Sequence, residues 1–280
     1  MGLSPKSMTA KQAKEYLDAH SVADYNLVDV RQDWEYEEFH LPGAKLIPLP
    51  ELAERLNEID AKKPTLVYCA VGGRSASAAS ILSGQGLEEV YNIKGGAMAW
   101  QDEYAIGPKE LGMPYLSGSE TPLEILAVAY AMERNLGAFF SRMASSAESA
   151  AIADSFKQLA RFESDHQWRL FKMANSLDPS LKDEEELEHR AAMDALEGGI
   201  TAEAFMELNK DYLRTSRGVI EAAMMIEAQA LDLYMRYADK AGNEEAGKLL
   251  QRLAQEEKAH LKLLGRLMDR KIVSSAPDDE

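Results

Sequence analysis

The sequence predicts a multidomain protein, in which an N-terminal α/β domain with a parallel sheet precedes a C-terminal all-α four-helix bundle. The length of 280 residues favours two domains. Short apolar strands alternate with helical stretches at the start of the chain, whereas the pattern from residue 121 onward is helical. Gly, Pro and Ser between them are typical of a linker. We therefore expect one domain over 1–106, a linker over 107–119, the bundle over 120–272 and a flexible tail over 273–280.

Composition limits the partners and the location. The formal charge of −16 argues against nucleic acid and against an anionic membrane, because both need a basic surface. No stretch approaches the ~20 apolar residues of a membrane span, and the N-terminus lacks an apolar signal-peptide core. One cysteine excludes an intrachain disulfide framework and a CxxC metal knuckle. The expected location is cytoplasmic.

The first half reads as strands separated by helices. Strands are expected at Asn26–Val30, Thr65–Cys69 and Val90–Ile93, and helices at Leu49–Ile59 and Ser75–Gly84. This alternation indicates a mainly parallel sheet covered by helices.

The second half begins with a helix-start signal, since Thr121 to Glu124 forms a capping box with Pro122 at the first helical position. The stretch between the second and third long helices exceeds a hairpin turn, which suggests a crossover connection. The expected helices run over 121–146, 147–176 and 181–197. A further helix starts after Thr201 and leads into a long one that ends at about Lys240, and the last runs from Asn243 to about Lys271.

A repeated set of metal-binding residue types lies on these helices. The set is Glu-x29-Glu-x2-His, and its second copy follows the first by 94 residues. A Glu and a His three positions apart share one helix face, so both can reach one ion. One Glu from each of two helices and a Glu-x-x-His from each of two others form the ligand set of a carboxylate-bridged metal pair. The six candidate ligands are Glu133, Glu163, His166, Glu227, Glu257 and His260.

The upstream Glu makes this pattern specific. Two further Glu-x-x-His pairs end at His40 and His189, but the positions corresponding to the upstream Glu hold Ser7 and Phe156. The alternative is a bundle whose glutamates are solvated on its outer faces. Carboxylate and imidazole ligands suit iron or manganese and also zinc, so the ligands alone do not fix the metal.

A second candidate site surrounds the only cysteine. Cys69 ends a predicted strand, and a Gly-rich loop leads from it to Arg74 and the next helix. Inward-pointing amides and a helix N-terminus stabilise a thiolate, and Arg74 adds a positive charge that could hold an anionic substrate. The alternative is a buried structural cysteine at a strand end. The loop residues assigned to substrate binding are Ala70, Val71, Gly72 and Gly73.

Three segments resemble rhodanese-family sulfurtransferases. They are Leu27–Arg31 with Glu35–Tyr36, His40–Ala44 and Ile47–Leu49; the loop Cys69–Ser75; and Val90–Trp100. The resemblance implies that Cys69 takes sulfane sulfur as a persulfide, from a small-molecule donor and on to a thiol acceptor. Related phosphatases place five residues between Cys and Arg, whereas this chain has four, which suits a single sulfur atom. Asp29 and Arg31 form either an ion pair that shapes the site, as in the family, or a purely structural pair.

The six-residue pattern resembles the rubrerythrin branch of the ferritin-like superfamily. That resemblance implies two iron ions in a non-haem centre bridged by Glu163 and Glu257 or their neighbours. Tyr234 lies two turns beyond Glu227, where a core tyrosine is the favoured role. The chain lacks the two CxxC pairs of a rubredoxin-like site, so electrons require an external donor protein. It also has Ala230 where the family carries a further Glu, which leaves the family's ligand exchange and peroxide reduction an open question.

The sequence therefore supports three functions. The first is a sulfurtransferase enzyme tied to a di-iron redox domain that handles peroxide or oxygen. The second is a non-catalytic sulfur carrier with an iron or oxidant sensor, and the third is iron binding or storage. The oligomeric state is open, with a homodimer as one option.

Overall fold

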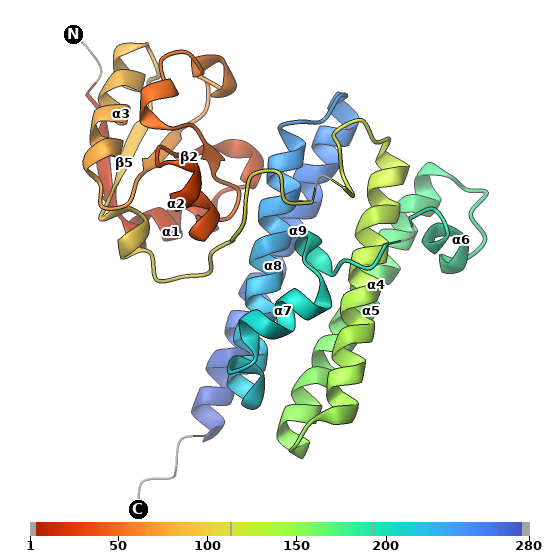
Figure 1. Ribbon diagram of the computed structural model, residues 1–280. Helices are drawn as coiled ribbons and strands as arrows, with labels where there is room; N and C mark the ends of the chain where they lie inside the picture. The colour runs from red at the N-terminus through yellow and green to blue at the C-terminus, as the bar shows by residue number, and fades with distance from the viewer. Residues whose placement is uncertain (1–3, 113, 192, 276–280) are drawn as a thin grey trace, which may run out of the picture. The chain divides into compact units, whose positions relative to one another are not determined.

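The computed structural model describes residues 4–112, 114–191 and 193–275, with side chains up to Asp269. The chain divides into two compact units between Leu111 and Gly112 (Figure 1). Each unit has its own hydrophobic core.

The N-terminal unit is built on a five-stranded parallel sheet with the order β1-β5-β4-β2-β3. Side chains alternate between its faces, so Leu66 and Tyr68 join one core cluster while Val67 and Cys69 join the other. The expected parallel sheet is confirmed. The strands are β1 Lys6–Thr9, β2 Asn26–Asp29, β3 Lys45–Leu46, β4 Thr65–Tyr68 and β5 Val90–Lys94, and the helices are α1 Ala10–Ala19, α2 Asp33–Glu38 and α3 Gly73–Gly84.

The helix expected at Leu49–Ile59 is wrong. This segment forms two short 3₁₀ turns, η2 at Leu49–Glu51 and η3 at Leu56–Glu58, and Arg55 between them has φ −111° and ψ 19°. A helix this short is marginal by itself, so tertiary packing decides its conformation. Here the irregular path still buries Leu52 and Ile59 in the core beneath the sheet.

Four long helices form the C-terminal unit, with α4 packed along α5 and α8 along α9 (Figure 1). The expected capping box is present, because Thr121 Oγ1 accepts from the amide of Glu124 and the Glu124 carboxylate accepts from the amide of Thr121. Asn243 Oδ1 caps α9 through the amide of Ala246. The helices are α4 Pro122–Ser146, α5 Ala150–Leu177, α8 Ser216–Ala238 and α9 Glu244–Ser275.

A long crossover joins α5 to α8, as expected, but its first part differs from the prediction. The charged helix expected over 181–197 is wrong, since α6 at Glu184–Glu188 is the one α-helix among the residues that the structure describes in this stretch. The chain beyond it closes into a tight loop through an antiparallel bridge between Ala195 and Thr201. The remaining crossover elements are η5 Glu197–Gly199, α7 Ala202–Asn209 and η6 Tyr212–Arg214.

The C-terminal tail expected over 273–280 differs in its first residues. Helix α9 continues to Ser275, so residues 273–275 are helical, and residues 276–280 lie outside the described part. Of the helices that the structure describes, none combines the length and apolar character needed to cross a membrane.

Candidate functional sites

The sulfur of Cys69 lies inside the loop between β4 and α3. The amide of Gly72 donates to Cys69 Sγ at 3.1 Å, and Ser75 Oγ lies 3.4 Å from the same sulfur. Burial alone would raise the pKa of the thiol, but the hydrogen bonds from Ser75 and from the amides of Gly72 and Val71 outweigh it and lower the pKa. The loop therefore favours the thiolate, the form of cysteine that reacts.

The four loop residues take different positions. The side chain of Val71 points outward and is 69% exposed, while its amide faces the sulfur. Gly72 has φ 103°, a left-handed conformation that favours glycine, and this turns its amide onto Cys69. Gly73 is the first residue of α3. Ala70 presents its carbonyl to the amide of Met98 at 3.0 Å, so its contacts hold the loop in place.

A second turn fixes the loop from behind. The 3₁₀ turn η4, Gly96–Ala99, donates the amide of Ala97 to the Cys69 carbonyl at 2.8 Å. Gly96 has φ 57°, and a Cβ on it would lie 2.0 Å from the Cys69 carbonyl oxygen. Only glycine allows this approach, because no real Cβ sits so close to a backbone oxygen.

Arg74 reaches the cysteine loop but is already paired. Its guanidinium donates to both carboxylate oxygens of Glu35, at 2.7 and 2.6 Å. The Arg74 side chain is 36% exposed and that of Glu35 is 12% exposed. The hydrogen bond from Arg74 lowers the pKa of Glu35 below its usual range. Much of the positive charge expected to attract an anionic substrate is thus offset by a residue that the sequence argument did not assign.

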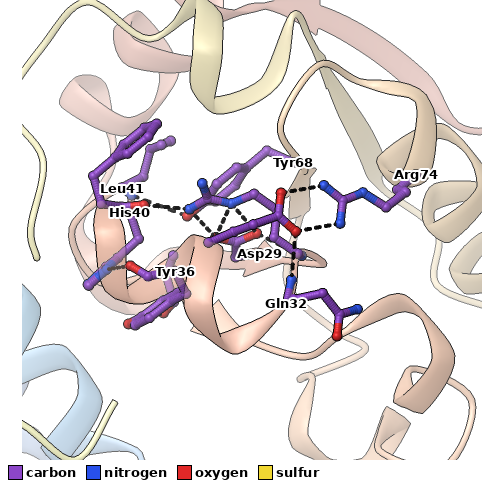
Figure 2. Close-up of polar contacts among 11 residues, drawn as sticks. Asp29, Gln32, Tyr36, His40, Leu41, Tyr68 and Arg74 are labelled. Atoms are coloured by element: carbon purple, nitrogen blue, oxygen red, sulfur yellow. Dashed lines mark hydrogen bonds and ion pairs between the residues drawn. The ribbon is translucent and has the colours of Figure 1, made fainter. Parts of the chain in front are cut away.

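Asp29 and Arg31 form the expected ion pair, with Arg31 Nη2 2.7 Å from Asp29 Oδ2. Both side chains are buried, and Arg31 also donates to the carbonyl of Phe39. In Figure 2, Asp29 marks the position of this pair, and Arg74 marks the position of the neighbouring ion pair. The charge of Arg31 adds a smaller effect to the hydrogen bond from Arg74, which is the main cause of the lowered pKa of Glu35.

The bundle brings the six candidate ligands together. They form two triplets, Glu133, Glu163 and His166 in one and Glu227, Glu257 and His260 in the other, with candidate ligand atoms within 4.8 Å of one another in each. His166 Nδ1 lies 3.3 Å from Glu133, and His260 Nδ1 lies 2.7 Å from Glu257. The two imidazole rings stack with their centroids 3.6 Å apart. All six residues are buried, which excludes solvated glutamates on an outer face.

Electrostatics shows what this cluster requires. Burial and then the charge of Glu197 raise the pKa of Glu133 well above its usual range, and burial raises the pKa of Glu257 to about 7. Burial opposes protonation of His260, yet the charge of Glu257 raises its pKa to about 11. Within the described residues, several buried ligand atoms of Glu133, Glu163 and His166 and of the second triplet lack hydrogen-bond partners. Cations would satisfy these atoms and charges together, so the residues fit a metal pair.

Sequence reasoning missed one acid in this cluster. Glu197 is completely buried, and its carboxylate oxygen lies within 4.8 Å of ligand atoms on Glu133 and Glu257. It comes from the crossover and is not one of the three residues that each copy of the Glu-x29-Glu-x2-His pattern contains. The turn signal Gly198-Gly199 immediately after it was visible in the sequence. Tyr234 is also buried here, and its pKa is raised by burial and then by the charge of Glu197.

Family comparisons agree with this division of the chain. A rhodanese-like domain model matches residues 9–103, and a rubrerythrin model matches residues 124–268, which is more than half of the chain. The chain therefore belongs to the rubrerythrin family and carries a rhodanese-like domain in front of the ferritin-like bundle. The rubrerythrin domain implies non-haem di-iron binding.

Individual relatives match a smaller part of the chain, and three of them cover between 26% and 36% of it. The protein is 38% identical over 78 residues to thiosulfate sulfurtransferase GlpE of Pseudomonas syringae, covering 28% of this chain and 74% of GlpE. It is 46% identical over 74 residues to YqhL of Bacillus subtilis, covering 26% of this chain and 59% of YqhL. A solved rhodanese-like domain protein from Staphylococcus aureus is 34% identical, with coverage of 36% and 97% and a TM-score of 0.34.

Proposed function

We propose that this protein is a sulfurtransferase that carries sulfane sulfur as a persulfide on Cys69, joined in one chain to a bundle that holds two iron ions. The observation behind the first part is the set of loop amides and Ser75 that surround Cys69 Sγ and lower its pKa. Similarity to proteins named thiosulfate sulfurtransferase supports the same chemistry.

The transfer takes two steps at one sulfur atom. The Cys69 thiolate attacks the terminal sulfur of a sulfane donor such as thiosulfate; a new S–S bond forms, the donor's S–S bond breaks, and sulfite leaves with the electron pair. An acceptor thiolate or cyanide then attacks the outer sulfur, and Cys69 leaves as the thiolate. The amides of Gly72 and Val71 stabilise the anionic sulfur in both steps. Neither step requires an added oxidant or reductant.

Mass spectrometry tests this part. Incubation of the full chain with thiosulfate should add about 32 Da, one sulfur atom, on Cys69. Cys69→Ser should lose both the adduct and thiosulfate:cyanide transfer. Retained transfer by Cys69→Ser would contradict the proposal. An adduct on Cys69 that no acceptor removes would instead favour a carrier without catalytic turnover.

The second part rests on the two buried triplets and their unpartnered ligand atoms. The residues that would hold the ions are those of the two Glu, Glu and His triplets. Iron, when bound, supplies reversible redox chemistry suited to peroxide or oxygen. The chain's own contribution is to bind the ions, to exclude water by burying every ligand, and to place Tyr234 beside the carboxylates. Electrons would come from an external donor protein.

Metal retention in matched variants tests this second part. Glu257→Ala should lower the metal content and abolish the rise in thermal midpoint that metal gives, because a ligand is lost and the remaining buried acids stay uncompensated. Glu186→Ala should change neither, since Glu186 lies in α6 and binds Lys182. Equal loss of metal in both variants would contradict the proposed site.

A further inference from the structure

Glu197 is a buried acid that the paired ligand pattern does not explain. Its side chain is fully buried, and neither carboxylate oxygen has a hydrogen-bond partner among the residues that the structure describes. The residue belongs to the short turn η5 in the crossover, outside the four long helices. A buried carboxylate without a partner is costly, so its presence calls for a compensating group.

The local fold is built to bring this turn into the bundle. Leu196 donates its amide to the Ile200 carbonyl at 2.8 Å, which closes the loop that contains Glu197. From α4, the side-chain amide of Asn135 donates to the carbonyls of Met193 and Ala195 at 3.0 and 2.9 Å. Contacts from one long helix thus hold the segment that leads to Glu197.

At Gly198, the same turn packs closely against α8. Gly198 has φ 77°, and a Cβ on it would lie 2.7 Å from the side chain of Gln229 and 3.0 Å from its backbone. Gln229 immediately precedes Ala230, which is fully buried and has only a methyl side chain. Glycine at 198 therefore permits an approach to α8 that any larger residue would block.

The surroundings of Glu197 are acidic. Its carboxylate lies within 4.8 Å of ligand atoms from both triplets, on Glu133 and on Glu257. The charges that act on it come from Glu257, Glu227 and Glu163. Oxygens without hydrogen-bond partners on both Glu197 and Glu133 therefore converge with Glu257 on one point, where a single cation would satisfy them together.

We propose that Glu197 is a seventh ligand of the metal pair, which the crossover delivers between the two repeated triplets. This inference rests on the proposed metal site. It assigns a binding role to the crossover, which otherwise only connects two helices. It also adds to the cluster a carboxylate that comes from outside the four long helices.

Manganese(II) binding by the full-length apoprotein, measured in competition with a chelator, tests the proposal. Glu197→Gln keeps the size of the side chain and removes its charge, and should weaken binding at least about tenfold. Its thermal midpoint without metal should not fall, because an unpaired buried acid has been removed. Glu186→Gln, an exposed change in the same crossover, should bind like the wild type.

A second variant tests the same idea with Glu197 intact. Gly198→Ala should push the turn away from Gln229 and weaken manganese binding as well. Wild-type affinity in Glu197→Gln, with a lower thermal midpoint without metal, would overturn the proposal and make Glu197 a structural acid. If the wild-type protein binds no metal, the proposed metal site itself is wrong. If the wild type and Glu197→Gln bind metal equally well, the site stands and only the role given to Glu197 is wrong.

Discussion

Gly96→Ala should disable the cysteine loop without unfolding the domain. Gly96 lies in the turn whose amides hold the Cys69 and Ala70 carbonyls. A Cβ at this position would lie 2.0 Å from the first carbonyl oxygen and 2.7 Å from the second. Because both contacts are with backbone, no side-chain rotation relieves them. The turn and the loop must separate, and the sulfur must then move relative to the amides of Gly72 and Val71.

The cost has two parts. Alanine in the left-handed conformation costs about 1–2 kcal/mol, and overpacking costs about 1–3 kcal/mol. The total of roughly 2–5 kcal/mol is less than the stability of most domains, about 5–15 kcal/mol. Gly86→Ala is the matched control, because Gly86 has φ 97° but an added Cβ meets nothing within 4 Å. The stability of Gly86→Ala should therefore fall only by the cost of placing alanine in the left-handed conformation.

Two assays separate these variants. Alkylation of Cys69 by iodoacetamide as a function of pH reports the thiol pKa, and thiosulfate:cyanide transfer reports activity. In Gly96→Ala the alkylation profile should move to higher pH and transfer should fall at least about tenfold, the effect of misplacing a reacting group. Gly86→Ala should retain both. If the two variants behave alike at Cys69, the turn does not position the loop and the reasoning is wrong.

Three further predictions concern charge. Ser75→Ala should raise the pKa of Cys69, because the hydrogen bond from Ser75 lowers it, and an unchanged alkylation profile would contradict this. Glu35→Gln should free the charge of Arg74 and lower the KM for thiosulfate severalfold, with only about 0.2–1 kcal/mol lost in stability because the pair is partly exposed; an unchanged KM would count against the role given to this pair. In the metal-free protein, the thermal midpoint of the bundle should fall as pH rises from 4.5 to about 7, because burial raises the pKa of Glu257 to about 7 and the folded state keeps a proton that the unfolded state loses; circular dichroism melts that rise over this range would contradict it.

The parts of the structure predicted from sequence are those with a repeated or strongly local signal. The two metal triplets lie on long helices, where spacing fixes the helix face, so the structure brings their side chains together. The strand–loop–helix pattern around Cys69 similarly placed the loop before α3. In both cases, residues close in sequence determine the relevant geometry.

The features that sequence reasoning missed depend on distant contacts. Glu35 pairs with Arg74 across 39 residues, and Glu197 reaches the bundle from the crossover, next to Gly198, which packs closely against Gln229. Acidic residues near Glu184–Glu188 favoured one longer helix over 181–197, but the bridge between Ala195 and Thr201 requires the chain to leave that helix. Tertiary contacts overrode local propensity at each of these places.

The measurement that tests the central claim most directly is the metal content of the full-length protein expressed with ample iron and purified without added metal. Two triplets of buried ligands in one chain predict about two metal ions per chain, chiefly iron. A ratio near two that falls in Glu227→Ala and persists in Glu186→Ala would support the account. Less than about one metal ion per chain in the wild type would contradict it, since the buried acids would then have to be satisfied without cations.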